Sequence, residues 1–455
     1  MSIMDFSGKH FLVIGAGISG RAASLALAGH GGSVTLNDMK AIDTAEQPWP
    51  DIKAAGVQLV FGSQETALLD GMDVVVPSPV ISPEIPIMKE AARRGLPIWS
   101  EVEVACRVTD ADMIGITGTN GKTTTTTLVG EIMKATGRQT VVGGNIGYGL
   151  SAQADNLPKE AVVVAELSSF QLEFTHSIKA KAATILNITP DHLDRHHTME
   201  GYAAAKERIF LNQDKGDYAV LNYDDERVRA MAKDMTGTVV YFSTCGEVPE
   251  GAFYQDGQLI LRLHGQDTVV CAETDLHLFG KHNIQNCLAA ILLTYAAGAP
   301  LDVIRQVLKD FKGVEHRLEK VRTIHGVTYY NDSKGTNVDA SMKALEAFPQ
   351  GHIILIAGGY DKKTPLDDFM ALAAKRVDTL ILIGDAAERF EAAAKKAGIQ
   401  DIRRTGYSME GAIMLARKIA KAPQAVLLSP ACSSFDMYDN FEQRGRVFKG
   451  IVNAI

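Results

Sequence analysis

The stretch Gly115–Thr127, GITGTNGKTTTTT, decides the interpretation of the whole chain. An apolar run, MIGIT, leads into it and a stretch of helical character follows, which is the strand, glycine-rich loop and helix order of a P-loop. The usual spacing, G-x-x-x-x-G-K followed by Ser or Thr, places its first glycine at position 116, where this chain has Ile116. We therefore predict a variant P-loop, against the alternative of a glycine-rich turn that binds no ligand.

In a P-loop, backbone N–H groups and the helix dipole hold phosphates, a lysine reaches the β- and γ-phosphates, and a hydroxyl group faces Mg²⁺. The residues expected at the phosphates of ATP are Gly118, Thr119, Asn120, Gly121, Lys122, Thr123 and Thr124. Glu166 ends another apolar run, AVVVAEL, where the acidic Mg²⁺ ligand of a phosphate site belongs. A strand-end carboxylate without such a role is the alternative.

The composition bounds the class of protein. The 455 residues exceed what one hydrophobic core usually serves, and 46% apolar with 22% charged residues is ordinary for a globular protein. A net charge of −8 argues against a nucleic-acid partner, which would require a basic face. No apolar run reaches the roughly 18 residues of a membrane span, and none of the five cysteines has C-x-x-C spacing. Because we also recognise no signal peptide, we expect a cytoplasmic enzyme with reduced thiols and no membrane partner.

Short apolar runs alternate with helical stretches in three consecutive segments, residues 1–106, 107–313 and 314–455. The runs that we interpret as strands include HFLVIG and SVTLND in the first segment, MIGIT and AATILNI in the second, and HIILIAGG and AVLLSP in the third. This alternation predicts an α/β fold with parallel sheets and helical crossovers. Ligands of such sheets bind beyond the carboxyl ends of the strands, where the polar motifs of this chain cluster.

The segment Gly15–Gly20, GAGISG, is a complete G-x-G-x-x-G between an apolar run and a helical stretch, and Asp38 ends the next apolar run. Alone, this pattern predicts dinucleotide binding. Because its glycines serve close approach and its helix end holds any phosphate, another nucleoside diphosphate fits as well. An NAD-dependent oxidoreductase is therefore the alternative from a different enzyme class.

Two motifs of the second segment leave alternatives open. His192 and His196 lie four residues apart in NITPDHLDRH, but no H-E-x-x-H pattern or cysteine ligand supports zinc. A single histidine in a Mg²⁺ and phosphate site is favoured, with a solvated polar loop as the alternative. From spacing alone, Lys206 in AAAKERIF is a solvated surface lysine.

Polar and cationic residues also gather near the end of the second segment and in the third. Asn283 and Asn286 lie one helical turn apart, so both can face one ligand. Arg317 suits a phosphate or carboxylate clamp, with a structural capping role as the alternative. After three apolar runs of the third segment, a set typical of a site for a small anionic molecule follows. Its members are Asp332, Ser333, Lys334, Thr336, Asn337, Lys362, Ser434, Phe435, Phe441 and Arg444.

A series of motifs runs along the chain: GTNGKTT, GGNIG, AELSSFQLE, DHLDRH, HNIQN, EHRLE, NDSKGTN and SPACSSFD…NFEQRG. In these motifs and their order the chain resembles the Mur ligases over nearly its full length, and NDSKGTN and SPACSSFD are similar to the member that adds D-glutamate. The resemblance implies three domains: a Rossmann-like UDP-sugar domain at 1–106, a P-loop-type ATPase at 107–313 and a Rossmann-like amino-acid domain at 314–455.

The implied activity is that of an ATP-dependent amide ligase. It adds D-glutamate to UDP-N-acetylmuramoyl-L-alanine through an acyl phosphate, as a monomer in cytoplasmic peptidoglycan precursor synthesis. Another Mur-type ligase or a folylpolyglutamate-type ligase is the nearest alternative.

The resemblance also implies roles for residues. At the UDP substrate it places Gly17, Ile18, Ser19, Asp38, Ser78, Asn145 and His192. At ATP it adds Asn283, Arg317, Asp332 and Lys334 to the P-loop residues. At D-glutamate it places Thr336, Lys362, Ser434, Phe435 and Phe441. For catalysis and two Mg²⁺ ions it implies Lys122, Thr123, Glu166, His192 and Lys206, the last as a carbamylated lysine, which overturns the surface interpretation.

Two positions depart from the family pattern. After the apolar run DVVV the chain reads Ser78-Pro79-Val80, where Ser-Pro-Gly is common in the family. Val80 in place of glycine puts the shape of the uracil pocket in question. The lysine loop reads GGYDKK instead of a form such as Gly-Gly-Asp-Gly-Lys. Both Lys362 and Lys363 are therefore candidates for contact with the side-chain carboxylate of glutamate.

Overall fold

The computed structural model describes residues 4–45, 48–278, 280–348 and 350–455. The chain forms two compact units, Met1–Asp275 with Ile284–Asp310 and Leu276–Asn283 with Phe311–Ile455, which we call the first unit and the second unit. Both contain sheets of mainly parallel strands with helical crossovers, so the predicted α/β class is confirmed. The predicted domain boundaries after residues 106 and 313 stay predictions.

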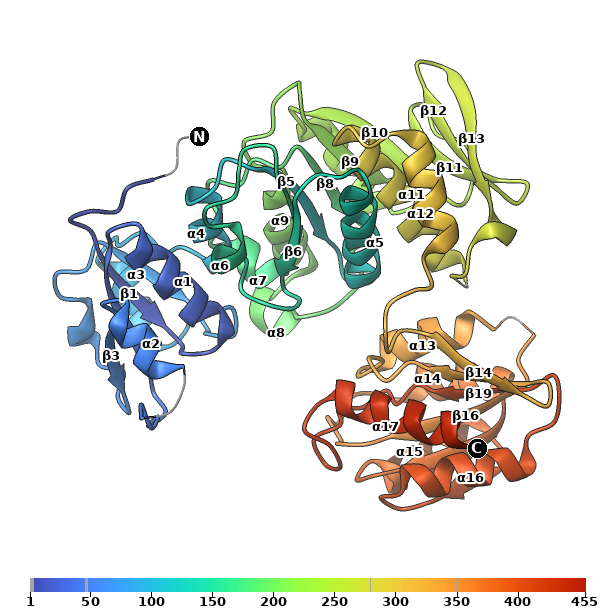
Figure 1. Ribbon diagram of the computed structural model, residues 1–455. Coiled ribbons are helices and arrows are strands. Elements are labelled where there is room, and N and C mark those ends of the chain that lie inside the picture. Colours follow the sequence, from blue (N-terminus) through green and yellow to red (C-terminus); the bar gives the residue numbers. More distant parts are fainter. Residues whose placement is uncertain (1–3, 46–47, 279, 349) are drawn as a thin grey trace. The chain divides into compact units, whose positions relative to one another are not determined.

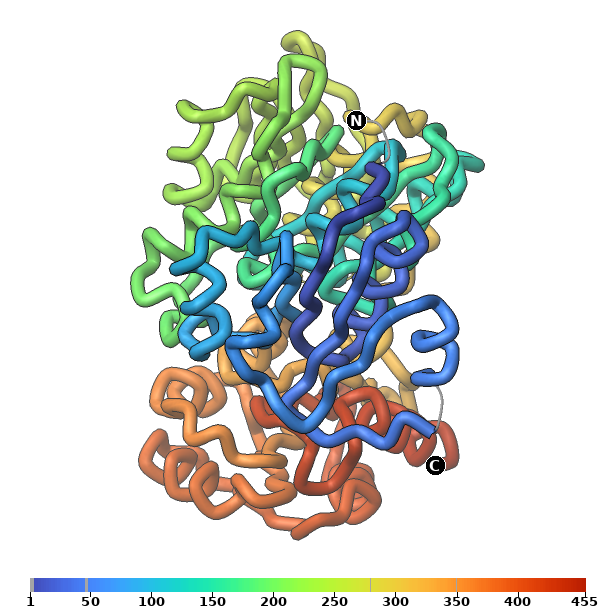
Figure 2. Tube along the Cα trace, turned by 90° about the vertical axis from the view of Figure 1, so that its left-hand side faces the viewer, coloured from blue at the N-terminus to red at the C-terminus, as the bar shows by residue number. Residues whose placement is uncertain are grey.

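The first unit begins with a parallel sheet, drawn in blue in Figure 1 and Figure 2. Its strand order is β3-β2-β1-β4. Its strands are β1 (His10–Ile14), β2 (Ser33–Asp38), β3 (Gln58–Phe61) and β4 (Val74–Pro77). The helical segments here are α1 (Ile18–Gly29), α2 (Trp49–Ala54), η1 (Thr66–Leu69), α3 (Pro86–Arg93) and α4 (Glu101–Arg107). Phe11 and Val13 pack into one apolar cluster, whereas Leu12 and Ile14 pack into another. Because both faces of β1 are covered beyond His10, its sequence is continuously apolar from Phe11 to Ile14.

A larger sheet of the first unit has the strand order β13-β12-β11-β10-β9-β8-β5-β7-β6. Its strands are β5 (Asp112–Thr117), β6 (Thr140–Gly144), β7 (Val162–Glu166), β8 (Ala182–Ile185), β9 (Tyr218–Asn222), β10 (Thr238–Ser243), β11 (Gly251–Gln255), β12 (Gln258–Leu263) and β13 (Gln266–Ala272). The α-helices between residues 107 and 310 are α5 (Lys122–Ala135), α6 (Leu150–Ala154), α7 (Ser169–Glu173), α8 (Leu193–His196), α9 (Met199–Glu207), α10 (Glu226–Ala230), α11 (Lys281–Ala296) and α12 (Leu301–Asp310). The 3-10 segments in this range are η2 (Arg208–Phe210), η3 (Met231–Asp234) and η4 (Glu273–Asp275).

Strands β11 to β13 form an antiparallel extension of this sheet, which is not among the elements predicted from the sequence. Two-residue turns, Asp256-Gly257 and His264-Gly265, join these strands, and all four residues have φ between 50° and 77°. Turns of this kind match the right-handed twist of paired strands, and Asp-Gly is the strongest short-range hairpin signal. The Asp256-Gly257 pair is therefore the sequence signal that identifies this hairpin.

The second unit contains a sheet in the order β14-β15-β19-β16-β17-β18, parallel except where β14 pairs with β15. Its strands are β14 (Glu319–Ile324), β15 (Val327–Asn331), β16 (Ile353–Gly358), β17 (Val377–Ile383), β18 (Ile402–Arg404) and β19 (Ala425–Leu428). Its helices are α13 (Val338–Glu346), α14 (Asp367–Arg376), α15 (Ala387–Ala397), α16 (Met409–Ile419) and α17 (Phe441–Ala454). Leu355 and Ala357 of β16 face one apolar cluster and Ile354 and Ile356 the other. Both faces of this sheet are therefore covered as well.

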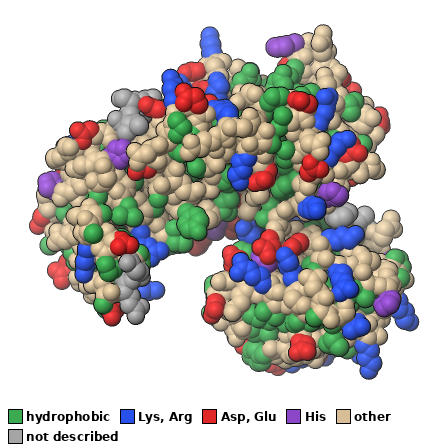
Figure 3. All heavy atoms as spheres, viewed as in Figure 1, with side chains coloured by type: hydrophobic (Ala, Val, Ile, Leu, Met, Phe, Trp, Pro, Cys, Tyr) green, Lys and Arg blue, Asp and Glu red, His purple; other side chains and the backbone are tan. Residues whose placement is uncertain are grey.

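The surface carries charges of both signs. On the face drawn in Figure 3, Lys and Arg side chains are interspersed with Asp and Glu side chains over both units. This distribution fits a chain with 46 basic and 54 acidic residues. Within the described parts of the chain, no helix has both the length and the apolar character needed to cross a membrane.

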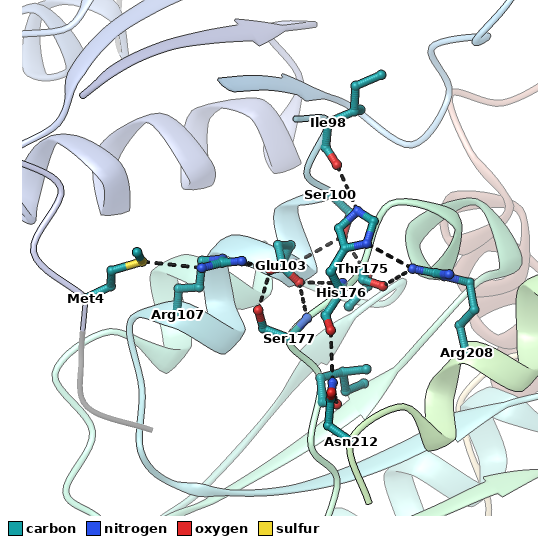
Figure 4. Close-up of polar contacts among 11 residues, drawn as sticks. Met4, Ile98, Ser100, Glu103, Arg107, Thr175, His176, Ser177, Arg208 and Asn212 are labelled. Atoms are coloured by element: carbon teal, nitrogen blue, oxygen red, sulfur yellow. Dashed lines mark hydrogen bonds and ion pairs between the residues drawn. The ribbon is translucent and has the colours of Figure 1, made fainter. Parts of the chain in front are cut away.

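A buried carboxylate ties α4 to the turn before β8 in the first unit. Glu103 accepts hydrogen bonds from the backbone N–H groups of His176 (2.6 Å) and Ser177 (2.7 Å), from the Ser177 hydroxyl (2.6 Å) and from Nε of Arg107 (2.7 Å) (Figure 4). From the other side of this turn, Arg208 approaches the His176 ring, with Nη2 3.2 Å from Nδ1. Because these bonds satisfy the charge, the buried ion pair is anchored without an unpaired oxygen.

A second buried carboxylate on α4 has a different environment. Oε1 of Glu101 accepts hydrogen bonds from the backbone N–H group (2.5 Å) and the hydroxyl group (2.6 Å) of Ser151. Oε2 is buried and has no hydrogen-bond partner among the described residues. Burial raises the pKa of Glu101 to about 6, although both bonds from Ser151 act in the opposite direction.

The variant Glu101→Gln tests this burial. The native carboxyl group keeps its proton up to about pH 6, whereas in the unfolded chain it ionises near its ordinary pKa of 4.5. The native state therefore binds more protons between these two values, and the free energy of unfolding falls as the pH rises through this window. Between about pH 4 and pH 7, we expect wild type to lose about 2 kcal/mol of stability relative to Glu101→Gln.

The measurement is urea unfolding followed by tryptophan fluorescence, because the two tryptophans of the chain, Trp49 and Trp99, pack in the apolar core beside α4. Glu65→Gln is the matched control, since it removes an exposed carboxylate from the same part of the chain. A stability difference between wild type and Glu101→Gln that stays constant over this pH range contradicts the assigned burial.

Candidate active site

The P-loop connects β5 to α5 at the carboxyl edge of the larger sheet, in the predicted strand, loop and helix order. Its curvature depends on Gly118, with a φ of 151°, and Gly121, with a φ of 86°, which are conformations that favour glycine. A Cβ atom at Gly121 would also lie 2.4 Å from Oδ1 of Asn286 on α11. The absent first glycine has no comparable role, because Ile116 belongs to β5.

The neighbouring strand end holds this loop in place. Beyond β8, the carbonyl of Asn187 accepts a hydrogen bond from N–H of Thr119 (3.0 Å) and its side-chain Oδ1 accepts one from N–H of Asn120 (2.8 Å). The amide nitrogen of Asn187 donates back to the Asn120 carbonyl (3.1 Å). Asn187 is not among the residues predicted from the sequence, although its place at the end of the apolar run AATILNI is a signal for such a residue.

Two lysine ammonium groups meet at one carbonyl oxygen of the P-loop. Nζ of Lys122 donates to the carbonyls of Gly118 (2.8 Å) and Thr119 (2.9 Å). Nζ of Lys206, on α9, donates to the same Gly118 carbonyl (3.0 Å) and lies 4.5 Å from the ring centroid of Tyr202. Lys206 is 1% exposed, so the surface position that its spacing predicts is wrong. Helix α9 packs its carboxyl end beneath the loop, and this long-range contact decides the burial.

The environment of Lys206 disfavours its charged form. Burial lowers the pKa of Lys206 well below its ordinary value of 10.5, and the positive charge of Lys122 acts in the same direction. Asp191 acts in the opposite direction but is a smaller influence. Lys206 therefore reaches the neutral amine form, which is nucleophilic, far more easily than an exposed lysine does.

Glu166 lies at the end of β7, paired with Ile116 of β5 and therefore beside the start of the P-loop. It is 2% exposed, and Oε1 accepts a hydrogen bond from Nδ2 of Asn145 (3.0 Å). Oε2 is buried without a hydrogen-bond partner among the described residues. A buried carboxylate oxygen without a partner is costly in an apolar surrounding and suits a cation.

His192 and His196 lie in an aromatic cluster rather than in a metal cage. The His192 ring centroid is 4.8 Å from that of Phe170, and Nε2 of His196 is 2.9 Å from the hydroxyl oxygen of Ser169. The described residues contain no group of three or more His, Cys, Asp or Glu side chains that could hold a metal ion. The zinc alternative therefore has no support, and a metal ion here would take further oxygen ligands from a bound phosphate.

The glycine-rich loop Gly15–Gly20 leads from β1 into α1, as predicted. Side chains at the ends of the two neighbouring strands fix its turn: Ser78 donates from its hydroxyl to the Gly15 carbonyl (3.1 Å), and N–H of Ala16 donates to Oδ2 of Asp38 (2.8 Å). A Cβ atom at Gly20 would lie 1.8 Å from the Gly15 carbonyl oxygen. Asp38 and Ser78 thus shape the loop, while the exposed side chain of Ile18 stands at the amino end of α1.

The segment from Asn145 to Ser151 links the surroundings of both glycine-rich loops. At its start, Asn145 contacts Glu166 through both its backbone (2.8 Å) and its side chain. At its end, Ser151 donates to Glu101, and a Cβ atom at Gly149 would lie 2.3 Å from Cβ of Ala22 on α1. A displacement of this segment would therefore reach the P-loop side and the α1 side together.

In the second unit, the predicted site residues follow β15, β16 and β19. Asp332 is buried, and its carboxylate accepts hydrogen bonds from the Ser429 hydroxyl (2.7 Å) and N–H of Leu318 (3.2 Å). Burial raises the pKa of Asp332 to about 7. Nζ of Lys334 lies 5.4 Å from the ring centroid of Phe441.

Arg444 joins two of these loops from α17. Its guanidinium donates to the hydroxyl (2.9 Å) and carbonyl (2.7 Å) of Ser333, and to the carbonyls of Cys432 (3.1 Å) and Ser433 (3.2 Å). The structure therefore brings the NDSKGTN and SPACSSFD motifs together. Ser434 in the second motif is buried, whereas Phe435 beside it is 68% exposed and open to a ligand.

The residues predicted at ATP divide between the two units. Lys122 belongs to the first unit, whereas the second unit contains Asn283, Arg317, Asp332 and Lys334. Their joint contact with one nucleotide stays a prediction, and so do the residue assignments at the UDP substrate and at D-glutamate.

Comparison with known proteins identifies the family. Residues 116–294 match the Mur ligase middle domain, and residues 316–432 match the glutamate ligase domain of Mur ligases. A UDP-N-acetylmuramoylalanine–D-glutamate ligase of Desulfitobacterium hafniense (strain Y51) is 46% identical over 453 residues, covering 99% of this chain and 98% of that protein. A protein of the same name from Pelotomaculum thermopropionicum is 43% identical over 453 residues, with coverage of 100% and 99%.

Solved structures share the fold. A UDP-N-acetylmuramate-alanine ligase from Thermotoga maritima matches with a TM-score of 0.58 and 19% identity, over 98% of this chain and 99% of its own. A MurF ligase from the same organism, in complex with ADP, matches with a TM-score of 0.59 and 18% identity, over 92% and 95%. All of these proteins are ligases, so the oxidoreductase alternative is not favoured. The identity to full-length relatives shows that this chain belongs to the Mur ligase family of ATP-dependent amide ligases.

Proposed function

We propose that this chain joins D-glutamate to the carboxyl group of UDP-N-acetylmuramoyl-L-alanine, with conversion of ATP to ADP and phosphate, in peptidoglycan precursor synthesis. The observation that carries this proposal is the meeting of Lys122 and Lys206 at the Gly118 carbonyl of a P-loop. The names of the full-length relatives support the choice of substrates. We propose further that the protein acts on these small molecules as a monomer in the cytoplasm.

The chemistry explains why cations are required. A carboxylate is a poor acyl donor, because negative charge shields its carbon and oxide would have to leave. Attack of a carboxylate oxygen on the γ-phosphorus breaks the bond to the β-phosphate oxygen and gives an acyl phosphate and ADP. The amine of D-glutamate then attacks the carbonyl carbon, phosphate leaves and the nitrogen loses a proton. Because the first step joins two anions, positive groups must offset their repulsion.

The P-loop supplies such groups from this chain. The N–H groups of residues 118–124 and the amino end of α5 hold the phosphates of ATP. Lys122, which donates to two neutral carbonyls of its own loop, exchanges them for phosphate oxygens, which are stronger acceptors. Lys122 then lies where negative charge develops on the transferred phosphoryl group.

The residues near the loop also fit Mg²⁺. Mg²⁺ prefers oxygen ligands, and the buried Oε2 of Glu166, which lacks a partner among the described residues, is such an oxygen. We assign the metal contacts to Thr123, Glu166, His192 and a modified Lys206. When bound, Mg²⁺ neutralises phosphate charge and favours attack on phosphorus.

The modification that we propose for Lys206 is a carbamate. The neutral amine attacks CO₂, a C–N bond forms and one proton leaves, so that a cationic side chain becomes a carboxylate. The lowered pKa of Lys206 supports this assignment, because the neutral amine is the reacting form. The new negative charge would also remove the like-charge contact with Lys122 at Gly118 and provide oxygen ligands for Mg²⁺.

The amino-acid contacts belong to the second unit. We propose that D-glutamate contacts Thr336, Lys362, Ser434, Phe435 and Phe441. Between the two candidate lysines we favour Lys362, whose Nζ donates to the Thr336 carbonyl (3.0 Å) in the NDSKGTN loop. Nζ of Lys363 instead lies 3.0 Å from Oδ2 of Asp361, within its own segment.

Product mass spectrometry with ATP, UDP-N-acetylmuramoyl-L-alanine and a panel of amino acids tests the reaction, with the D-glutamate adduct as the expected product. In the same assay, Lys122→Ala should lower turnover by about 10²–10³-fold, because a cation at the developing charge is lost. Lys134→Ala is the control, since Lys134 is an exposed lysine of the same helix that pairs with Glu131. Wild-type rates of phosphate release from Lys122→Ala would exclude the loop as the ATP site.

A second variant tests the carbamate. Lys206→Ala should lose turnover, and added formate or acetate should restore part of it, because a small carboxylate can occupy the space of the missing carbamate. Lys206→Arg is the control, since its guanidinium keeps a positive charge and cannot be carbamylated. In wild type labelled with ¹³C-bicarbonate, we expect a carbamate NMR signal that Lys206→Ala lacks. An identical signal in both proteins, or full activity of Lys206→Ala without added acid, contradicts the assignment.

A further inference from the structure

The segment Gly359–Thr364, which follows β16, carries two adjacent lysines. One arginine of α15, Arg389, forms hydrogen bonds with this segment at two points. Nε of Arg389 donates to Asp361 Oδ2 (2.9 Å), and Nη2 donates to Oδ1 (2.6 Å). Nη1 of the same guanidinium donates to the Thr364 carbonyl (2.8 Å). Arg389 therefore holds the residue before the two lysines and the residue after them at the same time.

With the segment bound in this way, the side chains of Lys362 and Lys363 lie in different directions and have different partners. Lys363 has a φ of 58°, its N–H donates to Asp361 Oδ1 (2.9 Å), and its Nζ lies 3.0 Å from Asp361 Oδ2. Its side chain is 80% exposed. Nζ of Lys362 instead donates to the Thr336 carbonyl in the loop after β15 (3.0 Å). Of these two lysines, only Lys362 contacts the loop after β15, where Thr336, another proposed amino-acid contact, lies.

The same contact controls the local charge. The Asp361 side chain is nearly buried, and hydrogen bonds from Arg389 lower its pKa well below its ordinary range. A carboxylate in this position repels an anionic substrate unless a cation faces it. A planar guanidinium with two parallel bonds to a carboxylate meets this need better than a lysine ammonium.

We propose that Arg389 is a positioning residue for the amino-acid substrate: it fixes the Asp361–Thr364 segment so that Lys362, and not Lys363, faces a substrate carboxylate, and it neutralises Asp361. Arg389 itself does not touch the substrate. The proposal rests on the proposed function, because it requires an acidic amino acid beside Lys362.

Steady-state kinetics of purified full-length variants tests this role. For Arg389→Met we expect the KM for D-glutamate to rise about tenfold, which corresponds to the loss of the charged contact between Lys362 and the substrate carboxylate. The KM values for ATP and for the UDP substrate should stay unchanged. Arg389→Lys keeps the charge but cannot bind Asp361 and Thr364 at the same time, so its KM for D-glutamate should rise less than that of Arg389→Met. The double variant Asp361→Asn, Arg389→Met should recover part of the affinity, because it removes the negative charge that Arg389 no longer offsets.

Lys396→Met is the matched control, since it removes an exposed cation of α15 that pairs with Asp367 on α14. An unchanged KM for D-glutamate in folded Arg389→Met, or equal rises in all three KM values, overturns the proposal. If Arg389→Met does not fold, Arg389→Lys decides, since a selective rise in the KM for the amino acid supports the role and wild-type constants refute it. If wild type uses another amino acid, the proposed function fails, and the same comparison with that amino acid still decides the role of Arg389.

Discussion

The contact on which the candidate site depends is the convergence of two lysine ammonium groups on the carbonyl oxygen of Gly118. Two positive charges share this one neutral carbonyl oxygen, and the burial of Lys206 makes their mutual repulsion stronger than it would be in water. Two physical changes relieve this contact: an anion can bind and draw Lys122 away, or Lys206 can lose its charge. A triphosphate provides the first and carbamylation provides the second, so both parts of the proposed chemistry answer one electrostatic constraint.

Sheet topology brings the partners of this contact together. Strands β8, β5 and β7 are neighbours in the larger sheet, and the carboxyl ends of parallel strands meet at one edge. The end of β5 provides the P-loop, the end of β8 provides Asn187 to hold it, and the end of β7 provides Glu166. A common P-loop has glycine at the position of Ile116. Its replacement does not affect the turn, because the turn begins only at Gly118. The strand–loop–helix order and the two later glycines therefore determine this loop, more than the full consensus spacing does.

The sequence was sufficient for features with local causes. The continuous apolar runs identified the parallel strands, and the P-loop followed from glycines, a lysine and a threonine at neighbouring positions. The sequence was insufficient where a contact between distant parts of the chain decides whether a residue is buried. Spacing on α9 predicts an exposed Lys206, because nothing in AAAKERIF encodes the loop that covers it; only resemblance to a family corrected that prediction. The two hairpins of β11 to β13 were missed although Asp256-Gly257 marks the first turn. Strand β14 was missed because half of its residues are exposed and it contains no continuous apolar run.

The two glycine-rich loops of the first unit show why a phosphate motif does not identify a ligand. Both combine glycines with the amino end of a helix, so both provide the same generic site for an anion. What distinguishes them is the set of side chains that other strands and helices add: Lys206 and Glu166 at one, Asp38 and Ser78 at the other. The same reasoning applies to the second unit, where two adjacent lysines have the same charge and reach. An arginine from α15 makes them different, because Arg389 fixes the backbone between Asp361 and Thr364. Specificity in this chain thus arises from long-range contacts placed on common local motifs.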